Sequence, residues 1–512
     1  MNNQFDVLIV GGGGAGCILA RSLAERCPQA QIALLEAGGE GRRSPFLDHG
    51  LGSVLQTWAP ESNWQLQTVP QAGLEQRVVP LTQGKVLGGG TSVNAMMYVH
   101  GDVSVVSEWH RTSGGHPNWE PQRFQAALKA QENCLGDGFD HALRGSNGPI
   151  TIRRTPQPSA SALAFLQAVT EVGYRRGDFN GSSQLDTADL MQLNLQANGQ
   201  RCSMAAAYLQ EPLPGNLTLL LGCQVQEIVM AAGKAEGVRL NDGRQLGAGH
   251  VVVTAGAFQT PALLMASGIG DPQLLSGASI DCQVENSQVG LNLSDHMRAM
   301  VAYSSSDDPG TTEFLCEAAL FTRSGLLDSP EPDIQINFSA GVDGFVPPEF
   351  IPNPAPQNTV IFVPVLARPL SRGSVRPLGS KREDGFGIDP GYLTHPTDLK
   401  VYTQAVDIVR KLANTEAMAR FCDQELCPAQ LDSEEYLKKY AQTIWHPVGS
   451  CAMGADPNLS ACSPDFRLRG TDNVFVADAS VLPSLPSGNP QAAIFAMASI
   501  AAEGIANQLQ TS

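Results

Sequence analysis

The sequence predicts an α/β protein (α+β overall) in which both ends of the chain form one parallel sheet and an antiparallel layer is inserted between them. Three observations predict this fold. A strand, a glycine-rich turn, a helix and a second strand follow one another at the N-terminus. A strand and a long helix recur at the C-terminus, and proline-rich extended segments occupy residues 300–440. Because parallel strands need helical crossovers, the two ends indicate a doubly wound sheet.

The N-terminal elements follow from hydrophobic periodicity. Asp6–Val10 is a short apolar run that ends in glycine, and from Ala15 onward apolar residues recur at helical spacing. A second apolar run, Ile32–Leu35, ends at Glu36. This order predicts a βαβ unit.

A later strand and helix are predicted in the middle of the chain. Residues 250–254 are apolar and β-branched. Thr260 and Pro261 follow as the expected N-cap and first residue of a helix that ends at Gly268, since proline favours the first helical position and glycine the position after the last. This pair extends the same sheet.

The C-terminal segment repeats the pattern. Val474–Ala477 is predicted as a strand, and Asn489 and Pro490 begin an apolar helix that runs to about Leu509.

The inserted region has a different character. Pro332–Phe338 and Val360–Leu366 read as extended segments, and a helical run lies near Thr397–Asn414. We expect this region to form a separate layer that faces a substrate.

Composition excludes several classes of protein. The 512 residues include 33 Lys+Arg and 50 Asp+Glu, a formal net charge of −17, which disfavours nucleic acid because phosphate backbones repel an acidic surface. The eleven cysteines include no CxxC pair, so we expect reduced thiols and no metal site. The sequence has no leader pattern and no run of about 18 apolar residues, so we expect a cytoplasmic protein without a membrane span.

A glycine motif indicates a nucleotide site. Gly11-x-Gly13-x-x-Gly16 lies between the first strand and helix, and Glu36 follows at the end of the second strand. Glycine lets the backbone approach a pyrophosphate, the helix N-terminus attracts its charge, and the acid can accept hydrogen bonds from ribose hydroxyls. The alternative is a tight packing turn. The motif alone does not separate FAD from NAD.

Two further segments extend the expected cofactor. A second glycine-rich run covers residues 84–97, and Asp478 follows the last strand, where a carboxylate could hold a ribityl hydroxyl. Together they imply one long cofactor that both ends of the chain contact.

Six sequence blocks, in order, resemble the glucose-methanol-choline (GMC) family of FAD-dependent oxidoreductases: GGGGAGCILA…LLEAGG, GKVLGGGTSVNAMMYVHGD, TAGAFQTPALLMASGIG, VGLNLSDH, WHPVGSCAMG and VADASVLPSLPSGNPQ. The match runs from Phe5 to about Gln508. The resemblance implies a Rossmann-like FAD-binding domain with an inserted antiparallel-sheet substrate domain. The FAD-binding domain is expected at 1–155, 200–300 and 445–512, and the substrate domain at 156–199 and 301–444.

The resemblance also implies which residues hold FAD. The ADP half would be held by Gly11, Gly13, Gly14, Ala15, Gly16, Glu36 and Val225. The pyrophosphate and isoalloxazine would contact Leu87, Thr91, Asn94, Ala95 and Met96. The site would be closed by Trp445, His446, Asp478, Ala479, Asn489 and Pro490.

The resemblance implies oxidation of a primary alcohol, with hydride transfer to flavin N5. His446 is the expected base, because an unperturbed histidine pKa of about 6.5 suits proton transfer near neutrality. Asn489 is expected to position the substrate oxygen, to cap the C-terminal helix, or to do both.

Some family members attach FAD through a histidine in the second glycine block. Asn94 stands there in this chain, so we expect non-covalent FAD. His100, His296 and Cys451 lie in family blocks but are expected to be structural. Electrons would pass to O2 or to another acceptor.

Alternative functions are a lyase, a fatty-acid photodecarboxylase or a non-catalytic flavin-binding protein. A photodecarboxylase would need a cysteine and an arginine in the inserted domain, and no cysteine lies between Cys316 and Cys422. Four phenylalanines of the inserted region are candidate pocket residues but more commonly belong to a core: Phe314, Phe345, Phe350 and Phe362.

Overall fold

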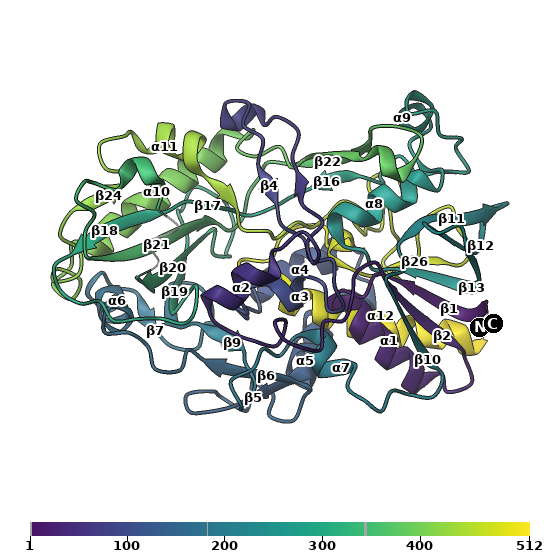
Figure 1. Ribbon diagram of the computed structural model, residues 1–512, viewed down its shortest axis with the longest axis horizontal. Helices are drawn as coiled ribbons and strands as arrows, with labels where there is room; N and C mark the ends of the chain where they lie inside the picture. The colour runs from purple at the N-terminus through teal and green to yellow at the C-terminus, as the bar shows by residue number, and fades with distance from the viewer. Residues whose placement is uncertain (1–2, 182, 342–345, 512) are drawn as a thin grey trace.

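The computed structural model describes residues 3–181, 183–341 and 346–511. Figure 1 shows two β-sheets side by side, with the chain termini close together at the outer end of the sheet on the right. The sheet on the left belongs to the inserted region. The predicted mixed α/β class is confirmed.

The first sheet has the predicted parallel core. Its parallel strands are β1 (Gln4–Val10), β2 (Ile32–Glu36), β10 (Leu217–Leu221), β13 (Gln245–Val253) and β26 (Val474–Val476). They are ordered β10-β2-β1-β13, and β26 pairs with the C-terminal half of β13. An antiparallel edge is added by β11 (Val225–Ala231) and β12 (Lys234–Leu240). Val7, Leu8 and Ile9 are fully buried because helices and loops cover both faces, which is why the second half of β1 is continuously apolar.

Helices α1 (Gly14–Arg26) and α12 (Gln491–Thr511) pack against each other beside this sheet (Figure 1). The predicted C-terminal helix is therefore confirmed, with its start at Gln491. By length and composition α12 could cross a membrane, and it is the one such helix among the described residues. It is mostly buried and also packs on α5 (Pro121–Gln131), as expected for a core helix.

Helix α8 (Gly256–Ala266) corrects one prediction. Thr260 and Pro261 lie inside this helix rather than at its start. Proline lacks the N–H that would bond the carbonyl four residues earlier. That carbonyl, of Ala257, accepts a hydrogen bond from Ser450 Oγ at 2.5 Å instead. A residue distant in sequence thus makes an internal proline acceptable.

The second sheet is antiparallel except for one short parallel pair at its edge. Its long strands are β18 (Val301–Ser305), β19 (Ala318–Thr322), β20 (Ile334–Ala340) and β21 (Asn358–Leu366). Shorter strands complete it: β7 (Arg175–Arg176), β8 (Thr187–Leu190), β17 (Met297–Arg298), β24 (Glu425–Cys427) and β25 (Gln442–Thr443). Helices α6 (Ala160–Glu171) and α10 (Pro396–Ala413) pack on β20, where Phe338 stacks on Phe165 and meets Phe362 edge-on.

The domain boundaries stay a prediction, and the sheet pairings show where part of residues 301–444 packs. β22 (Gly373–Pro377) and β23 (Phe386–Asp389) pair with β16 (Leu291–Leu293) and pack on α8, so this part of 301–444 joins the first core. A further small sheet joins β5 (Glu132–Cys134), β6 (Ile150–Arg154) and β9 (Gln192–Asn194).

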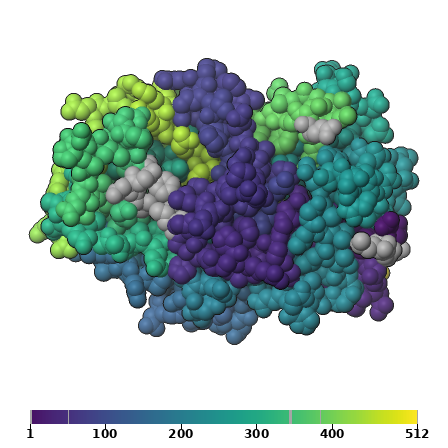
Figure 2. Space-filling view, in the orientation of Figure 1, coloured from purple at the N-terminus to yellow at the C-terminus, as the bar shows by residue number. Residues whose placement is uncertain are grey.

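The segment that follows β2 crosses the face between the two sheets. Figure 2 shows these N-terminal residues, in purple, across the middle of the visible surface. The segment contains α2 (Leu51–Thr57), β3 (Leu66–Gln67), β4 (Pro80–Leu81) and α3 (Gly90–Val93). The remaining helices of the described residues are α4 (Val103–Thr112), α7 (Met204–Tyr208), α9 (Pro272–Gly277) and α11 (Ser433–Tyr440). The isolated short pair is β14 (Ile269–Gly270) with β15 (Val284–Glu285).

Candidate active site

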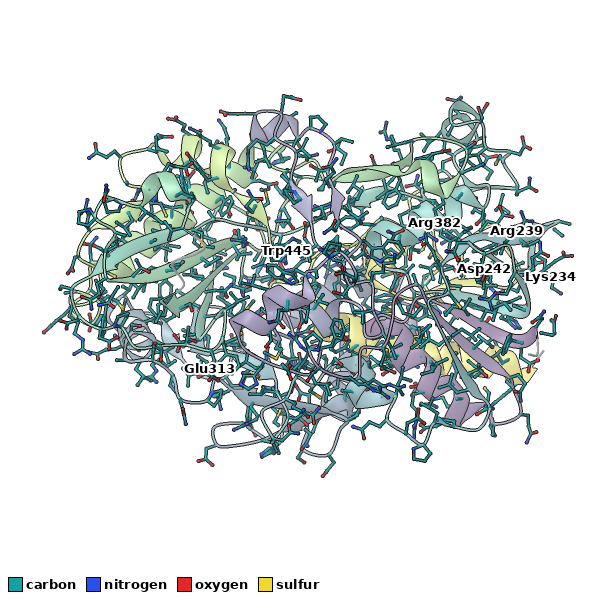
Figure 3. The ribbon with its side chains drawn as sticks, viewed as in Figure 1. Lys234, Arg239, Asp242, Glu313, Arg382 and Trp445 are labelled. Carbon is teal, nitrogen blue, oxygen red and sulfur yellow. The ribbon has the colours of Figure 1, made fainter. Side chains whose placement is uncertain are left out.

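One cavity extends from the C-terminal ends of β1 and β2 to the inner face of the second sheet. Figure 3 places Trp445 near the centre of the molecule, between the two sheets, and Arg382 over the first sheet. The predicted residues that line the cavity are Gly11, Gly13, Gly14, Ala15, Glu36, Thr91, Asn94, Ala95, Val225, Trp445, His446, Asp478, Ala479, Asn489 and Pro490. The two ends of the chain therefore meet at one site.

Three predicted cofactor residues do not line this cavity, and their contact with a cofactor stays a prediction. Leu87 and Met96 are buried in hydrophobic cores. Gly16 packs against the preceding strand, where a Cβ would lie 2.0 Å from the Gly11 carbonyl oxygen. Its role is close helix–strand packing, which leaves no room for a side chain.

The first glycine turn fits a bound pyrophosphate. Gly13 is the N-cap of α1, no side chain caps this helix, and its first turn contains no acidic residue. The first N–H groups therefore lack a side-chain acceptor and face the cavity, where they would attract an anion. A Cβ on Gly90 would meet nothing within 4 Å, so the second glycine run also leaves open space there.

Glu36 is held beneath this turn. Its Oε2 accepts from the Gly12 N–H and its Oε1 from the Gly38 N–H, both at 2.8 Å. Burial raises the pKa of this carboxyl to about 7, against the opposing effect of the two N–H groups. Each oxygen keeps a lone pair for a ribose hydroxyl. The structure therefore fits the predicted role of Glu36.

Asp478 has a structural role that the sequence did not predict. Its Oδ2 accepts from the Gly256 N–H and Thr260 Oγ1, and its Oδ1 accepts from the Ser480 N–H and Oγ. These four bonds fill the acceptor capacity of a carboxylate. The expected bond from a ribityl hydroxyl to this carboxylate is therefore not supported, although Asp478 borders the cavity.

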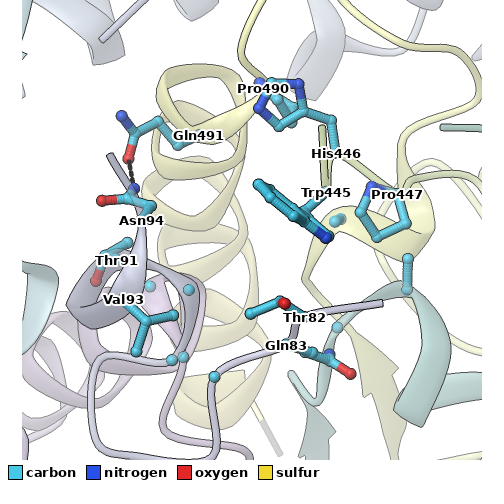
Figure 4. Close-up of a pocket in the computed structure, with 18 of the residues that line it drawn as sticks. Thr82, Gln83, Thr91, Val93, Asn94, Trp445, His446, Pro447, Pro490 and Gln491 are labelled. Carbon is cyan, nitrogen blue, oxygen red and sulfur yellow. Dashed lines mark hydrogen bonds between the residues drawn. The ribbon is translucent and has the colours of Figure 1, made fainter. Parts of the chain in front are cut away.

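Asn94 is fixed by three contacts at the wall of the cavity. Its Nδ2 donates to Gln491 Oε1 at 3.0 Å, which Figure 4 shows as a dashed line, and its Oδ1 accepts from Arg201 Nη1 at 2.7 Å and from the Met96 N–H. His100 lies outside the cavity lining and pairs with the buried Glu132 at 2.6 Å. No histidine side chain therefore reaches the cavity from the described residues of the second glycine block, where a covalent attachment would be made.

His446 is oriented by a second histidine. Its Nδ1 lies 3.1 Å from His296 Nδ1, and His296 Nε2 lies 2.8 Å from the Ala367 carbonyl oxygen. Since a carbonyl only accepts, neutral His296 carries its proton on Nε2 and accepts on Nδ1. His446 must then carry its own proton on Nδ1. Its Nε2 is unprotonated and accepts a hydrogen bond from the Asn489 amide.

Asn489 completes this relay. Its Nδ2 lies 3.1 Å from His446 Nε2, and its Oδ1 accepts from Gln335 Nε2 at 3.4 Å. Gln335 also donates to Asn337 at 2.7 Å, which fixes the direction of the amides. The Asn489 side chain is thus bonded to the base and to Gln335. Its two predicted roles, positioning the substrate oxygen and capping α12, stay predictions. Figure 4 shows His446 beside Pro490, at the start of α12.

The surroundings keep His446 neutral. Burial lowers its pKa well below 6.5, and His296 adds to this effect. Burial also lowers the pKa of His296 to about 3. The backbone is held by Asp295, whose Oδ1 accepts from the His446 N–H at 2.7 Å while its Oδ2 accepts from Tyr392 and Thr443.

Trp445 forms the adjoining wall in a strained conformation. Its φ is +61°, uncommon for a bulky residue, and its Nε1 is buried without a hydrogen-bond partner among the described residues. Trp58 packs edge-on against it, with ring centroids 5.1 Å apart. The Arg298 guanidinium lies over the ring, 5.4 Å from its centroid. The orphan N–H fits a cofactor or substrate acceptor at this wall.

Several residues of this site were not predicted from the sequence. His296 was expected to be only structural, yet it sets the tautomer of the base. Asp295, Arg298 and Gln335 were not considered, and of these Asp295 could have been found in the VGLNLSDH block. Among the candidate phenylalanines, Phe314, Phe350 and Phe362 pack in cores, and Phe345 lies outside the described residues.

The described residues contain no group of three or more His, Cys, Asp or Glu side chains arranged to hold a metal ion. The glycine turn, the uncapped helix, Glu36 and the His446 relay all lie along one cavity. GMC oxidoreductase family models match residues 5–298 and 369–498. The chain belongs to the GMC oxidoreductase family.

Relatives within this family extend the likeness over nearly the whole chain. Pyridoxine 4-oxidase of Microbacterium luteolum is 30% identical over 510 residues, which cover 97% of this chain and 98% of the relative. Choline oxidase of Arthrobacter globiformis is 30% identical, with coverage of 96% and 92%. The crystal structure of pyridoxine 4-oxidase from Mesorbium loti superposes with a TM-score of 0.89 at 28% identity and covers 97% of this chain and 98% of that chain. The predicted class, an FAD-dependent GMC oxidoreductase acting on alcohol CH–OH groups, is confirmed.

Proposed function

We propose that this GMC oxidoreductase oxidises a primary alcohol to an aldehyde with non-covalently bound FAD, in the cytoplasm. One observation carries the proposal: His446 Nε2 is unprotonated at the cavity and accepts a hydrogen bond from the Asn489 amide, a bond that an alcohol placed between the two side chains would replace. A primary alcohol has the O–H donor and oxygen acceptor that such a pair binds.

The residues act on the hydroxyl proton. An alcohol bound between them would donate its O–H to His446 Nε2 and accept an N–H from Asn489. His446 takes the proton on Nε2 while its Nδ1–H remains bonded to His296. Bound FAD supplies the two-electron acceptor for the hydride. Gly13, Gly14 and Glu36 would hold its ADP half, and Trp445 would border the reacting end.

Non-covalent attachment is supported by the side chains around the cavity. Asn94 occupies the position of the attachment histidine, and His446 is the one histidine among the described cavity residues. Burial raises the pKa of the Cys316 thiol, whose Sγ–H donates to the Ala318 carbonyl, so it stays protonated. We expect acid or heat to release FAD into solution. Electrons would then pass to O2 or to another acceptor.

The cytoplasmic assignment is supported by the cysteines. All eleven are free thiols, and ten of them are buried or partly buried. A reducing compartment keeps such thiols reduced.

The decisive experiment replaces the base. His446→Ala should retain FAD but slow anaerobic flavin reduction by alcohols about 10²-fold or more, the usual contribution of a positioned base. Asn489→Ala should slow it less, because the base remains. His141→Ala, an exposed loop variant, serves as the control. Flavin reduction is measured directly because turnover can be limited by reoxidation. Reduction of His446→Ala at the wild-type rate would remove this residue from the mechanism.

The same preparation distinguishes the alternative functions. Cys316 lies just outside the cysteine-free interval and does line the cavity, so a light-dependent reaction is measured as well. Alcohol-dependent bleaching in the dark supports the oxidase or dehydrogenase. Carbon dioxide release from a fatty acid only under illumination would indicate a photodecarboxylase. If neither reaction occurs, the protein is a non-catalytic flavin-binding protein.

A further inference from the structure

Arg298 brings a positive charge to the substrate end of the cavity. Arg298 is the last residue of strand β17, whose pairing places it opposite Val365 of β21 and Gln442 of β25. Cross-strand partners point to the same face, so Arg298 shares the inner face with Val365 and Val363. Both Arg298 and Val363 line the cavity.

This guanidinium has no acidic partner. The Arg298 side chain makes no hydrogen bond or ion pair with the described residues; its guanidinium lies over the face of Trp445, and its charge also interacts with Tyr402 and Tyr436. Burial lowers its pKa, yet part of its surface stays open because it faces the cavity. The acidic residues among the described cavity lining are Glu36 and Asp478, which belong to the first sheet. A buried cation is costly unless something pairs with it.

Arg298 lies near the base. Its guanidinium is 5.4 Å from the ring centroid of Trp445, the residue that precedes His446, and all three side chains line the same cavity. A substrate with its hydroxyl at His446 therefore has Arg298 within the same cavity for its other end.

The walls between these two points are apolar and partly aromatic. Met300, Leu315, Ile361 and Val363 line the cavity there, together with the Trp58 and Trp445 rings. Such walls fit a flat, apolar body.

We propose that Arg298 binds a carboxylate on the substrate, so that the alcohol oxidised by this enzyme carries an acid group opposite its hydroxymethyl group. The proposal rests on the proposed function. One guanidinium fork matches one carboxylate in bidentate geometry, whereas a phosphate dianion would call for further donors. A quaternary ammonium such as choline is disfavoured, because Arg298 repels it and already covers the Trp445 face.

The test compares alcohols of different charge on the holoenzyme. Anaerobic flavin reduction is measured with 4-(hydroxymethyl)benzoate, with its methyl ester and with choline. We expect the efficiency, reduction rate over Kd, to be at least about tenfold higher for the acid than for the ester, and choline to be inactive. Equal or lower efficiency for the acid would overturn the proposal.

A variant series assigns the effect to Arg298. Arg298→Met should lower the efficiency with the acid about 10- to 100-fold and change that with the ester less than about threefold. Arg298→Lys should keep part of the preference. Arg376→Met, an exposed arginine on β22, is the matched control and should behave as wild type. A preference for the acid that survives in Arg298→Met would assign recognition elsewhere and refute the role of Arg298.

A binding measurement separates this proposal from the proposed function. Benzoate and benzamide cannot be oxidised, and their binding is followed by the perturbed flavin absorption spectrum. We expect benzoate to bind wild type more tightly than benzamide, and Arg298→Met to bind both equally. Arg298-dependent benzoate binding without reduction by any alcohol would support the anchor and refute the oxidation. Alcohol oxidation without any preference for the acid would support the oxidation and refute the carboxylate anchor. If Arg298→Met loses FAD, the preference for the acid over the ester is compared between wild type and Arg298→Lys instead.

Discussion

The properties of His446 depend on a single neighbouring nitrogen. His296 bonds the Ala367 carbonyl through Nε2, so its Nδ1 can only accept when neutral, and this fixes the proton of His446 on Nδ1. Without that acceptor, either tautomer of His446 would be available. His296 is therefore a positioning residue for the base.

We predict that His296→Ala slows flavin reduction by about tenfold or more and shifts its pH dependence. His296 contributes to the low pKa of His446, so its removal raises that pKa. The acid limb of the rate profile, where His446 becomes protonated and inactive, should move to higher pH. The measurement is anaerobic reduction between pH 5 and 9. An unchanged profile with a reduced rate would indicate a structural role alone.

We predict that Glu36→Ala weakens FAD retention rather than chemistry. Glu36 bonds Gly12 and Gly38 beneath the glycine turn, at the end of the cavity opposite His446. Hydrogen bonds to a charged group contribute roughly 1.5–3 kcal/mol, so affinity should fall at least about tenfold. Flavin occupancy after dialysis measures this. Full occupancy with collapsed turnover would contradict the assigned position.

The β1–α1 turn shows how one element shapes the cofactor site. Gly11 has φ +112°, and a Cβ there would lie 2.5 Å from the Thr254 carbonyl oxygen. Gly16 likewise touches Gly11 directly. The strand and helix can approach this closely only without side chains, and this approach points the uncapped end of α1 at the cavity.

We predict that Gly16→Ala destabilises the protein by about 1–3 kcal/mol and lowers FAD occupancy, because overpacking must displace the turn. Gly39→Ala is the matched control: it follows β2, its backbone is not in the left-handed region, and a Cβ would meet nothing within 4 Å. It should change stability by less than about 0.5 kcal/mol. Denaturant unfolding and flavin content are the measurements, and equal behaviour of the two variants would refute the packing argument.

The base and the glycine turn between β1 and α1 lie far apart in the sequence and meet only in the folded protein. His446 is bonded to Asp295, to His296 and to Asn489, which precedes α12, and Asn489 is bonded in turn to Gln335 of the second sheet. Burial at this junction of the two sheets lowers the pKa of both histidines. The two histidines therefore stay neutral in the folded protein at pH values where they would be protonated in the unfolded chain.

We predict that the two buried histidines lower the free energy of unfolding on acidification below pH 6.5. Unfolded histidines take up protons near their usual pKa of about 6.5, while folded His446 and His296 stay neutral, so acid stabilises the unfolded state relative to the folded one. This contribution grows until each folded pKa is reached, about 3 for His296, and each histidine adds at most about 1.4 kcal/mol per pH unit. Glu36, whose pKa is raised to about 7 in the folded protein, acts in the opposite direction, so the effect is measured as a difference between variants. Between pH 7 and pH 5 the free energy of unfolding should fall less in His446→Ala than in the wild type; equal falls would contradict the prediction.

The sequence by itself determined the local features of this protein. Apolar runs and glycine spacing predicted β1, α1, β2, β20, β21, α10 and α12, because strand and helix periodicity and glycine conformations depend on neighbouring residues. The block resemblance identified the family, His446 and Asn489. These are properties of short stretches of chain.

Only the tertiary structure decided how distant residues share their polar groups. Pro261 lies inside a helix because Ser450 satisfies the Ala257 carbonyl, and the Asp478 carboxylate is filled by Gly256, Thr260 and Ser480. His296 and His446 meet across 150 residues of sequence, and Arg298 reaches the same cavity without a partner. A side chain's partners are set by packing in three dimensions, and no local pattern encodes which buried group will be satisfied or left open.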